Sequence, residues 1–426
     1  MTFTIIGLLI VFALMGAPLF TVIIAAAMYG FHLSEIDLSV MAIELYRIAD
    51  TPILLALPLF TFAGYILGES NTSQRLVTLT RAFLGWMPGG LAIVAFVVCA
   101  LFTAFTGASG VTIVAMGALL YPALTQAGYT DRFSLGLVTT SGSLGLLLPP
   151  SLPLILYGII AQQMNGGEQV SIENLFLAGL FPALLMIVML SAWSVWANRG
   201  NQVPLIRFSV RNCLLALKAA GWEVPLPLFV FFGIYSGYFA VSEAAAVTAM
   251  YVLVVEVLIY REIPLKKLPG IIRESMVMVG GILLILGVSL ALTNYLIDVE
   301  APMKLFKFCE TFVSSKLVFL ILLNIFLLIL GAMLDIFSAI IIMVPLMLPV
   351  ALEYGVHPVH LGIIFLANMQ IGYFTPPVGM NLFIASYRFN KPIVEIYRAT
   401  IPFMLVLLLS VLIITYWPQL SLFLIS

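Results

Sequence analysis

The feature that most constrains the fold is a set of helix-breaking residues that occurs twice with unchanged spacing. The first copy consists of Pro122, Gly128, Gly145 and the pair Pro149-Pro150. Adding 227 to each number gives Pro349, Gly355, Gly372 and the pair Pro376-Pro377. A single Pro-Pro pair can recur by chance, but the shared spacing of the whole set indicates an internal repeat. The chain is therefore expected to fold as two related halves.

The composition predicts a protein that lies in a lipid bilayer. Charged residues make up 9% of the chain, against about a quarter in ordinary soluble domains. Six stretches carry no charged side chain, namely 1–34, 82–130, 133–167, 174–198, 275–297 and 399–426. Because a helix needs about 20 apolar residues to cross the hydrocarbon core, we expect about ten to twelve spanning segments and some shorter re-entrant ones. The net charge of −1 offers no electrostatic basis for binding nucleic acid.

The segments before residue 90 are interpreted as scaffold. Residues 3–31 predict one retained helix, since they lack the basic start and the cleavage site of a signal peptide. The amphipathic segment 34–50 predicts an interfacial or arm-like helix, and 51–68 a span interrupted by proline. Basic residues gather in 199–218 and 261–274, which the positive-inside rule assigns to the cytoplasm.

The block 91–163 predicts a helical hairpin followed by a broken helix. Residues 91–124 are uncharged and contain the sequence TGASG near their centre, which suits two half-length helices that meet at a tip. An irregular tip at membrane depth is tolerated where it is buried in protein or lines a wet cavity. The following span contains the Pro149-Pro150 pair, and proline removes a backbone donor, so we expect the helix to unwind over 145–150.

The second half repeats this plan, with a hairpin tip near 331–338 and a broken helix that contains Pro376-Pro377. The expected first repeat is 1–198, with scaffold over 1–90, hairpin and broken helix over 91–163, and a spanning helix over 174–198. A linker follows over 199–218. The expected second repeat is 219–426, with scaffold over 219–315, hairpin and broken helix over 316–387, and a terminal helix over 399–426. Two such halves are typical of secondary transporters, in which the repeats are often inverted.

At this point the chain resembles the large membrane subunit of tripartite ATP-independent periplasmic (TRAP) transporters. The matching segments cover essentially the whole chain: LPLFTFAG (57–64), FTGASG (105–110), SLGLLLPPSLPLILYG (143–158), IYSGYFAVSEAAA (234–246), LGAMLD (330–335) and TPPVGMNLF (375–383). One departure is Ala240-Val241-Ser242-Glu243, where the family often has Thr-Pro-Thr-Glu.

The resemblance implies an all-helical, multi-pass protein of the bacterial inner membrane that works by an elevator motion. It implies sodium-coupled import of a small organic acid, a small four-helix membrane subunit as partner, and a soluble periplasmic binding protein that delivers the substrate. It implies no enzymatic activity and no ATP, and the chain has no Walker A pattern. No bound cofactor is expected, and Na⁺ is expected as the coupling ion.

Two alternatives have a basis in the sequence. A stand-alone ion-coupled transporter of organic anions would share this architecture without needing a binding protein. Residues 107–110 also fit the GxSG pattern of rhomboid-type intramembrane serine proteases, which need a histidine base in a neighbouring span. His32, His357 and His360 all stand in connections on the sequence pattern, which leaves that base missing.

The repeat predicts two ion sites, because an unwound helix exposes carbonyl oxygens that a cation can bind. The first site is predicted from the broken helix and the hydroxyls of the first tip, with the residues Gly145, Leu148, Pro149, Thr103, Thr106 and Ser109. The equivalent second site comprises Gly372, Thr375, Pro376, Gly331, Met333 and Asp335. Thr375 stands at the register position of Leu148, so the second site is expected to depend more on a side chain.

The substrate is expected between the two tips, near Ser143, Asn368 and Asn381, with Arg47 as a possible carboxylate ligand. Guanidinium groups match carboxylates in bidentate geometry, and Arg132, Arg388 and Arg398 are further candidates. For each arginine the alternative is that it extends to the membrane interface. For Asp335 the alternative is a helix end, and for Glu243 a scaffold contact. The sequence leaves the identity of the acid open.

Overall fold

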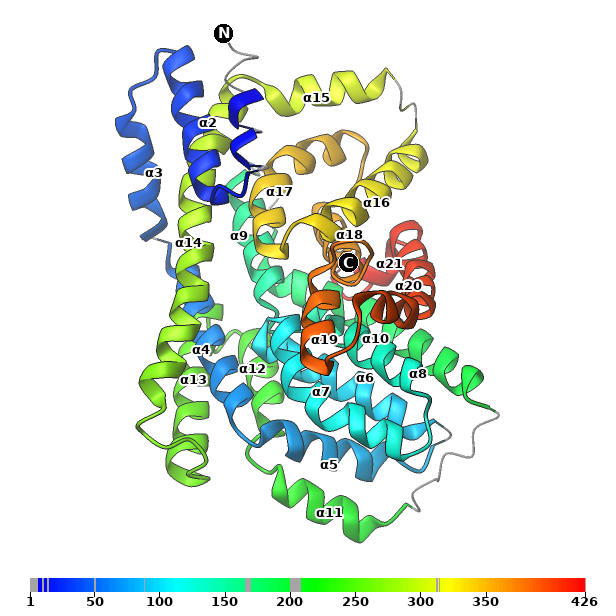
Figure 1. Cartoon of the computed structure of the whole chain (residues 1–426). Helices are drawn as coiled ribbons and strands as arrows, with labels where there is room; N and C mark the ends of the chain where they lie inside the picture. The colour runs from blue at the N-terminus through cyan, green and yellow to red at the C-terminus, as the bar shows by residue number, and fades with distance from the viewer. Residues whose placement is uncertain are drawn as a thin grey trace.

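In the computed structural model the chain is a tall bundle of helices (Figure 1). The described residues are 7–9, 11–13, 15–49, 51–87, 89–164, 170–199, 208–311, 313 and 315–425, and every regular element among them is helical. Nine helices of these residues are long and apolar enough to cross a membrane, and four apolar helices are shorter. The count is lower than the predicted ten to twelve because turns divide several uncharged runs into shorter helices, such as Gly90–Thr106.

The N-terminal segments form α2 (Leu19–Leu33), α3 (Ser39–Ala49), a 3-10 turn (Pro52–Leu55), α4 (Ala56–Glu69) and α5 (Thr72–Leu84). The prediction of one helix over 3–31 is wrong. The chain turns before α2 at Gly16, which has a φ of +87°, and Pro18 then caps α2. In the segment 51–68, predicted as a span interrupted by proline, a 3-10 turn leads directly into α4, and α4 itself is continuous. Pro58 lies in the first turn of this helix, where proline leaves no hydrogen bond unmade.

The first hairpin consists of α6 (Gly90–Thr106) and α7 (Ser109–Gln126), which contain 17 and 18 residues. These arms are longer than the predicted half-length helices. The broken helix follows as α8 (Asp131–Ser141), a 3-10 turn (Leu144–Leu147) and α9 (Leu152–Met164), and then comes α10 (Ile172–Ala197). Unwinding thus begins at Gly142, three residues before the predicted start.

The linker contains α11 (Val210–Ala219), and α12 (Pro225–Tyr235) and α13 (Val241–Leu253) follow it. A π-helical turn (Val254–Ile259) extends α13, and the long α14 (Leu268–Asp298) leads to α15 (Ala301–Glu310). The second hairpin is α16 (Lys316–Met333) and α17 (Ile336–Glu353), and the second broken helix is α18 (Pro358–Gly372) and α19 (Met380–Phe389). The chain ends with α20 (Ile393–Tyr416) and α21 (Gln419–Leu422).

The terminal helix begins at Ile393, not at 399 as predicted from the uncharged run. Its first turns carry Glu395 and Arg398, so a criterion based on the absence of charge places its start too late. Pro392 caps the helix and determines the observed boundary.

The helix boundaries repeat with the offset of 227. Adding 227 to the bounds of α7 gives 336–353, which are the bounds of α17. The same addition relates α5 to α15 within two residues at each end. These two helices lie at opposite ends of the molecule, α5 at the bottom and α15 at the top of Figure 1. The sequence register is thus present in the three-dimensional arrangement.

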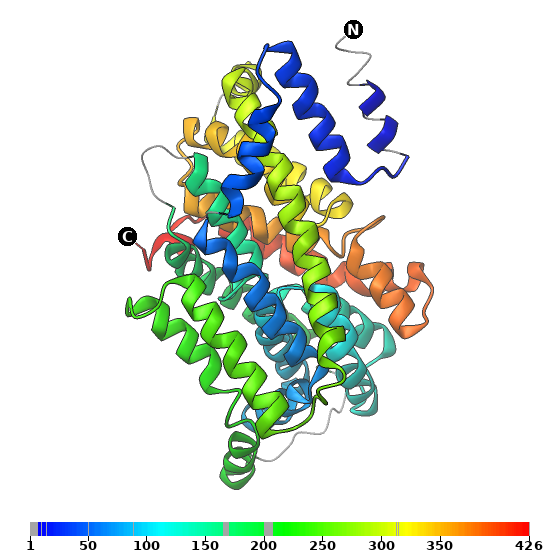
Figure 2. The same ribbon diagram turned by 90° about the vertical axis from the view of Figure 1, so that its left-hand side faces the viewer.

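Packing divides the bundle into two regions. On one side α4 lies against α13 and α14, and Figure 2 shows these long helices side by side. On the other side α6 and the broken helices pack against α10 or α20, and the second hairpin packs on α18. An aromatic group fills this second region, with Phe403 5.4 Å from Phe133 and 4.7 Å from Trp193 between ring centroids.

A buried charge cluster joins three parts of the chain at the lower end. Arg75 of α5 forms ion pairs with Glu223 before α12, Glu256 in the π-helical turn and Glu262 before α14. The ring of Tyr260 lies 4.0 Å from the guanidinium carbon. Burial opposes the charge of Glu262, but the hydrogen bonds from Asn71 and Arg75 hold the pKa of this carboxyl below its usual value.

Candidate functional site

The first hairpin tip lies directly on the first broken helix. The helix α6 ends at Gly107, whose φ of +64° is the left-handed conformation that glycine adopts without strain. The Thr103 hydroxyl donates to the Gly142 carbonyl at 2.8 Å and lies 2.7 Å from the Thr112 hydroxyl. A Cβ atom on Gly145 would lie 2.1 Å from the Ala100 carbonyl oxygen. Only glycine permits so close an approach of the two backbones.

The second half repeats this contact. A Cβ atom on Gly372 would lie 2.4 Å from the carbonyl carbon of Gly331, so the second broken helix also meets its hairpin backbone to backbone. The tip is fixed by one further hydrogen bond, from the Ile336 amide to the Tyr373 hydroxyl at 2.9 Å. The predicted pairs of Gly145 with the first tip and Gly372 with the second are therefore brought together.

The broken helices are buried up to their breaks, and the second is also exposed along much of α19 beyond its break. From Phe133 to Ala161 every residue is buried except Leu148 and Pro149. From Pro358 to Phe374 every residue is buried, and exposure begins at Thr375. Both Pro-Pro pairs have cis peptide bonds. The partly exposed positions 148 and 149 correspond in the register to 375 and 376, which are also partly exposed.

A hydrogen bond joins the two halves at the first tip. The Ser109 hydroxyl donates to the side-chain oxygen of Asn381 at 2.8 Å. The backbone N–H of Asn381 donates to the Tyr373 carbonyl at 2.9 Å. Two polar atoms here are buried without a partner in the described structure, Thr106 Oγ1 and Asn381 Nδ2. Because buried polar atoms in proteins almost always have a partner, these two atoms are available to a ligand.

The predicted ligands of the second site have different surroundings. The Thr375 hydroxyl donates to the Ile371 carbonyl at 2.9 Å, which leaves its oxygen lone pairs free. Asp335 is exposed and caps α17, accepting hydrogen bonds from the Phe337 and Ser338 amides at 3.0 Å. The Met333 side chain is 69% exposed, so only its backbone could face an ion.

The structure does not bring Asn368 to the tips. Its side chain donates to Asn324 of α16 at 2.6 Å, and Thr415 of α20 donates to the same oxygen at 3.2 Å. Asn324 precedes the tip residue Gly331 by about two helical turns. Ser143 is buried and donates to the Thr140 carbonyl at 3.2 Å.

The arginine candidates occupy positions at helix ends. Arg47 lies in α3, and its side chain is outside the described part of the structure. Arg132 donates through two nitrogens to the Arg398 carbonyl, and Arg388 donates to the Val114 carbonyl. Glu243 accepts a hydrogen bond from the Ala240 amide and so caps its own helix, α13.

Sequence reasoning did not identify several polar residues of this region. Tyr373 holds the second tip, Thr112 pairs with Thr103, and Gln370 is buried with its side-chain oxygen unpartnered. The register contained a signal for Gln370, because it corresponds to Ser143. His360 is also buried, in α18 and beside the Thr415 carbonyl, and is not in a polar connection as predicted.

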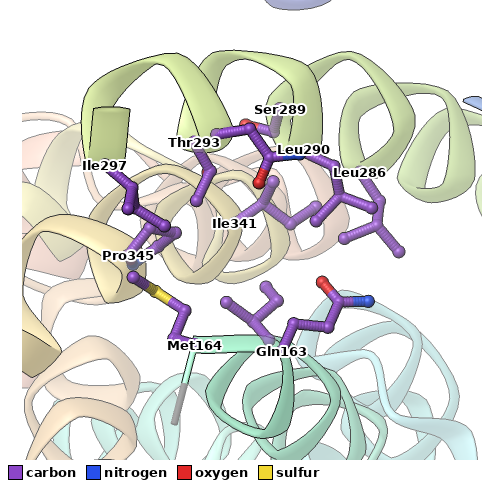
Figure 3. A pocket seen from close by; sticks show the side chains of 11 residues that line it. Gln163, Met164, Leu286, Ser289, Leu290, Thr293, Ile297, Ile341 and Pro345 are labelled. Atoms are coloured by element: carbon purple, nitrogen blue, oxygen red, sulfur yellow. The ribbon is translucent and has the colours of Figure 1, made fainter. Parts of the chain in front are cut away.

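A small cavity lies where α14 meets the hairpins and broken helices. Its volume is about 30 Å³, and α9, α14 and α17 form its walls (Figure 3). Gln163, Ser289, Thr293 and Asn294 supply polar groups among apolar neighbours. A cavity of this size has room for one or two water molecules. The boundary between the two packing regions is therefore partly polar.

Comparison with known proteins gives the family. Residues 6–420 match the family model described as "Tripartite ATP-independent periplasmic transporter, DctM component". The chain belongs to this family. This TRAP large permease is 34% identical to the C4-dicarboxylate TRAP transporter large permease protein DctM of Pseudomonas aeruginosa, over 90% of this chain and 88% of that one.

Two further relatives have other substrates in their names. The permease is 31% identical to the ectoine/5-hydroxyectoine TRAP transporter large permease protein UehC of Ruegeria pomeroyi, over 100% of this chain and 98% of that one. It is also 31% identical to the isethionate TRAP transporter permease protein DctMQ of Oleidesulfovibrio alaskensis, over 99% of this chain and 64% of that one.

The fold resembles that of a solved transporter. The Alcanivorax borkumensis YdaH transporter, described as having an unusual topology, superposes with a TM-score of 0.62 at 12% identity, over 87% of this chain and 85% of that one. The permease is thus a multi-pass inner-membrane protein of a transporter family, not an enzyme. The protease alternative fails, and the Ser109 hydroxyl is bonded to Asn381, not to a histidine.

Proposed function

We propose that this permease imports a small organic acid across the inner membrane, driven by Na⁺, with the substrate delivered by a soluble periplasmic binding protein. The observation that carries the proposal is the pair of breaks at equivalent positions, each packed backbone to backbone against a hairpin and each partly exposed, at residues 148–149 and 375–376. Unwound segments of this kind expose carbonyl oxygens that bind cations and amides that bind anionic groups.

The first ion is proposed to bind between the first tip and the first break. The carbonyls near Gly145, Leu148 and Pro149 belong to the unwound segment, and the hydroxyls of Thr103, Thr106 and Ser109 lie at the end of the hairpin. The unpartnered Thr106 hydroxyl supports this assignment, because a bound cation would give its oxygen a partner. The Thr103 hydroxyl donates its hydrogen to Gly142 and keeps lone pairs for the ion.

The second ion is proposed to bind at the equivalent place in the other half. Carbonyls near Gly331, Met333, Gly372 and Pro376 and the Thr375 hydroxyl would form its shell, and Asp335 stands at the same tip. The Thr375 hydroxyl already donates to Ile371, so its remaining lone pairs suit a cation. Leu148 offers no such group, which makes the second site the one that depends on a side chain.

The substrate is proposed to lie beside the link between the two halves. Asn381 has an unpartnered Nδ2 group there, which can donate a hydrogen bond to a carboxylate. Ser143 and Asn368 donate to neighbouring oxygens within the protein and contribute less directly, if at all, in this conformation. Movement of the hairpins and broken helices against α4, α13 and α14 would carry ions and substrate across as an elevator, and the polar cavity at this boundary is consistent with sliding.

Two partners are proposed, a small four-helix membrane subunit and the periplasmic binding protein. The family description calls the transporter tripartite, and this chain covers 64% of the relative named DctMQ, which is long enough to hold a second membrane component. The alternative is a stand-alone ion-coupled transporter of organic anions. The substrate names of the relatives include a dicarboxylate, isethionate and ectoine, so they do not select one acid for this chain.

Reconstitution into proteoliposomes tests the proposal. If two Na⁺ ions accompany one monoanion, each cycle moves one net charge, which supplies about 2.3 kcal/mol at about 100 mV, or roughly fifty-fold accumulation. Uptake should require the small subunit, the loaded binding protein, inward sodium and a negative interior. Uptake in sodium-free buffer would remove sodium coupling, and uptake by this chain alone without a binding protein would establish the stand-alone alternative.

A substitution tests the second ion site. Thr375→Val removes the hydroxyl while preserving shape, and we expect the sodium concentration for half-maximal uptake to rise about tenfold, as for the loss of about 1.4 kcal/mol of binding. Thr400→Val is the matched control, since Thr400 is buried and its hydroxyl likewise donates to the carbonyl four residues earlier. An unchanged sodium dependence in Thr375→Val, with the control also unchanged, would show that the site is wrong.

A further inference from the structure

The linker helix α11 has an apolar face that is largely exposed. The face turned toward α5 buries Cys213 and Ala216, and the Cys213 thiol donates to the Ala82 carbonyl at 3.3 Å. On another side the helix exposes Val210 by 63%, Leu214 by 62% and Leu217 by 40%. These three positions follow the i, i+4, i+7 spacing of one helical face. The helix therefore has two apolar faces, one packed on α5 and one exposed.

Basic side chains border this apolar stripe. Arg211 and Lys218 lie on α11 about 80–100° around the helix from Val210, on the flank of the stripe. Both are exposed, and neither makes an ion pair or side-chain hydrogen bond within the described residues. Residues 199–222 contain no acidic side chain. This end of the molecule thus presents positive charge beside exposed apolar groups.

A recess between α5 and α11 contains a third basic group. Its volume is about 430 Å³, and Thr78 and Arg81 of α5 and Asn212 of α11 line it together with three alanines and Leu215. Arg81 is exposed and, like Arg211 and Lys218, has no partner within the described structure. A guanidinium and a side-chain amide in one recess can both donate hydrogen bonds to phosphate oxygens, whereas the Thr78 hydroxyl already donates to the Gln74 carbonyl.

Aromatic residues show where the membrane surface lies relative to α11. Trp86, at the end of α5, packs against Phe208, just before α11, with ring centroids 6.4 Å apart. Both rings are about half exposed. Tryptophan is enriched at the headgroup level of bilayers. Because these rings lie beside the start of α11, they favour a position of this helix near the headgroups.

We propose that α11 and the recess beside it bind anionic phospholipid of the cytoplasmic leaflet. The acyl region covers Val210, Leu214 and Leu217, and the headgroup phosphate lies in the recess near Arg81, with Arg211 and Lys218 along the surface. An amphipathic helix with a basic flank binds an interface in this way, through its buried apolar area and its attraction to anionic lipid. The lipid would fix the end of α5, and with it the base of the first hairpin.

Titration of the full-length chain with lipid tests the proposal. Native mass spectrometry of the purified protein would measure the affinity for phosphatidylglycerol and for phosphatidylcholine. We expect preference for phosphatidylglycerol, and an affinity about a hundredfold lower in the variant Arg81→Gln/Arg211→Gln/Lys218→Gln, from about fivefold for each basic side chain near the surface. Leu214→Ser should lower the affinity for both lipids, because it removes an apolar contact with the acyl chains.

The control is Lys304→Gln/Lys307→Gln on α15, the horizontal helix at the other end of the molecule, which should keep the parent affinity. Single substitutions replace the triple variant if its melting temperature without lipid falls. Equal affinity for the two lipids, an unchanged affinity in the basic variants, or equal stabilisation by inorganic phosphate alone would each overturn the proposal. The test does not depend on transport, so it is independent of the proposed function.

Discussion

Removal of the Arg75 side chain should be among the most damaging single changes in the scaffold. Arg75→Met keeps the length of the side chain but leaves Glu223, Glu256 and Glu262 without their cation. The Glu256 side chain is fully buried, and its remaining contact is the hydrogen bond from Thr72 at 2.9 Å. Breaking a buried ion pair by removing one partner costs about 3–5 kcal/mol. We expect a loss of this size in the free energy of unfolding.

The measurement is a denaturant titration in mixed micelles at neutral pH. Arg81→Met is the matched control, since Arg81 lies on the same helix but is exposed and unpaired, and it should change stability by less than about 0.5 kcal/mol. The double variant Arg75→Met/Glu256→Gln should recover part of the loss, because it no longer buries that unpaired charge. A loss below about 1 kcal/mol in Arg75→Met would refute the assignment of this cluster as a buried ionic link.

Lowering the pH should reduce the difference in the free energy of unfolding between the parent protein and Arg75→Met. In the parent the pKa of Glu262 is lowered by Asn71 and Arg75, so the stability it contributes is present above its ordinary value of 4.5 and is lost as the pH falls through the folded value. In the variant the carboxylates of Glu223, Glu256 and Glu262 repel one another because their cation is missing. The same fall in pH protonates them and so removes this repulsion. The gap should thus be largest near neutral pH and smallest at acid pH.

Three further outcomes follow from the site. Gly372→Ala should lower stability by about 1–3 kcal/mol and impair uptake, because its Cβ meets the Gly331 backbone, whereas Gly280→Ala, with nothing within 4 Å, should not. Asp335→Ser keeps the cap of α17 and removes the charge, so unchanged sodium affinity in this variant would show that Asp335 acts only as a cap. A double-mutant cycle of Ser109→Ala and Asn381→Ala should give a coupling energy of about 1 kcal/mol, and additive effects would contradict their hydrogen bond.

The positions of the hairpin tips could be predicted from the sequence because glycine and proline act locally. The tip in TGASG lies at Gly107–Ala108, and the second tip lies within the predicted 331–338. The boundaries of the broken helices were less accessible. At Gly142, which ends α8, a Cβ would lie 2.7 Å from Ile113 Cγ1 and 3.0 Å from the Ser109 carbonyl oxygen, so glycine is needed there for a contact with α7 that no local pattern reveals.

The choice of ligand side chains depends on tertiary contacts, which the sequence does not reveal. Asn368 faces Asn324 and Thr415, whose positions depend on how α16 and α20 pack around α18. A buried helix has apolar and polar residues on all sides, so its periodicity does not show which face meets a hairpin. The contribution of Tyr373 through its hydroxyl was missed for the same reason.

If the two sites function as proposed, the hydrogen bond between Ser109 and Asn381 affects how tightly sodium movement is coupled to substrate movement. It connects the hairpin of one repeat to the broken helix of the other, so a separate movement of either repeat would have to break this bond. The two ions and the substrate would then move as one unit, and movement of one half without the other would require this hydrogen bond to break first. If the proposed sites are correct, this link would couple the two halves and oppose the passage of sodium without substrate.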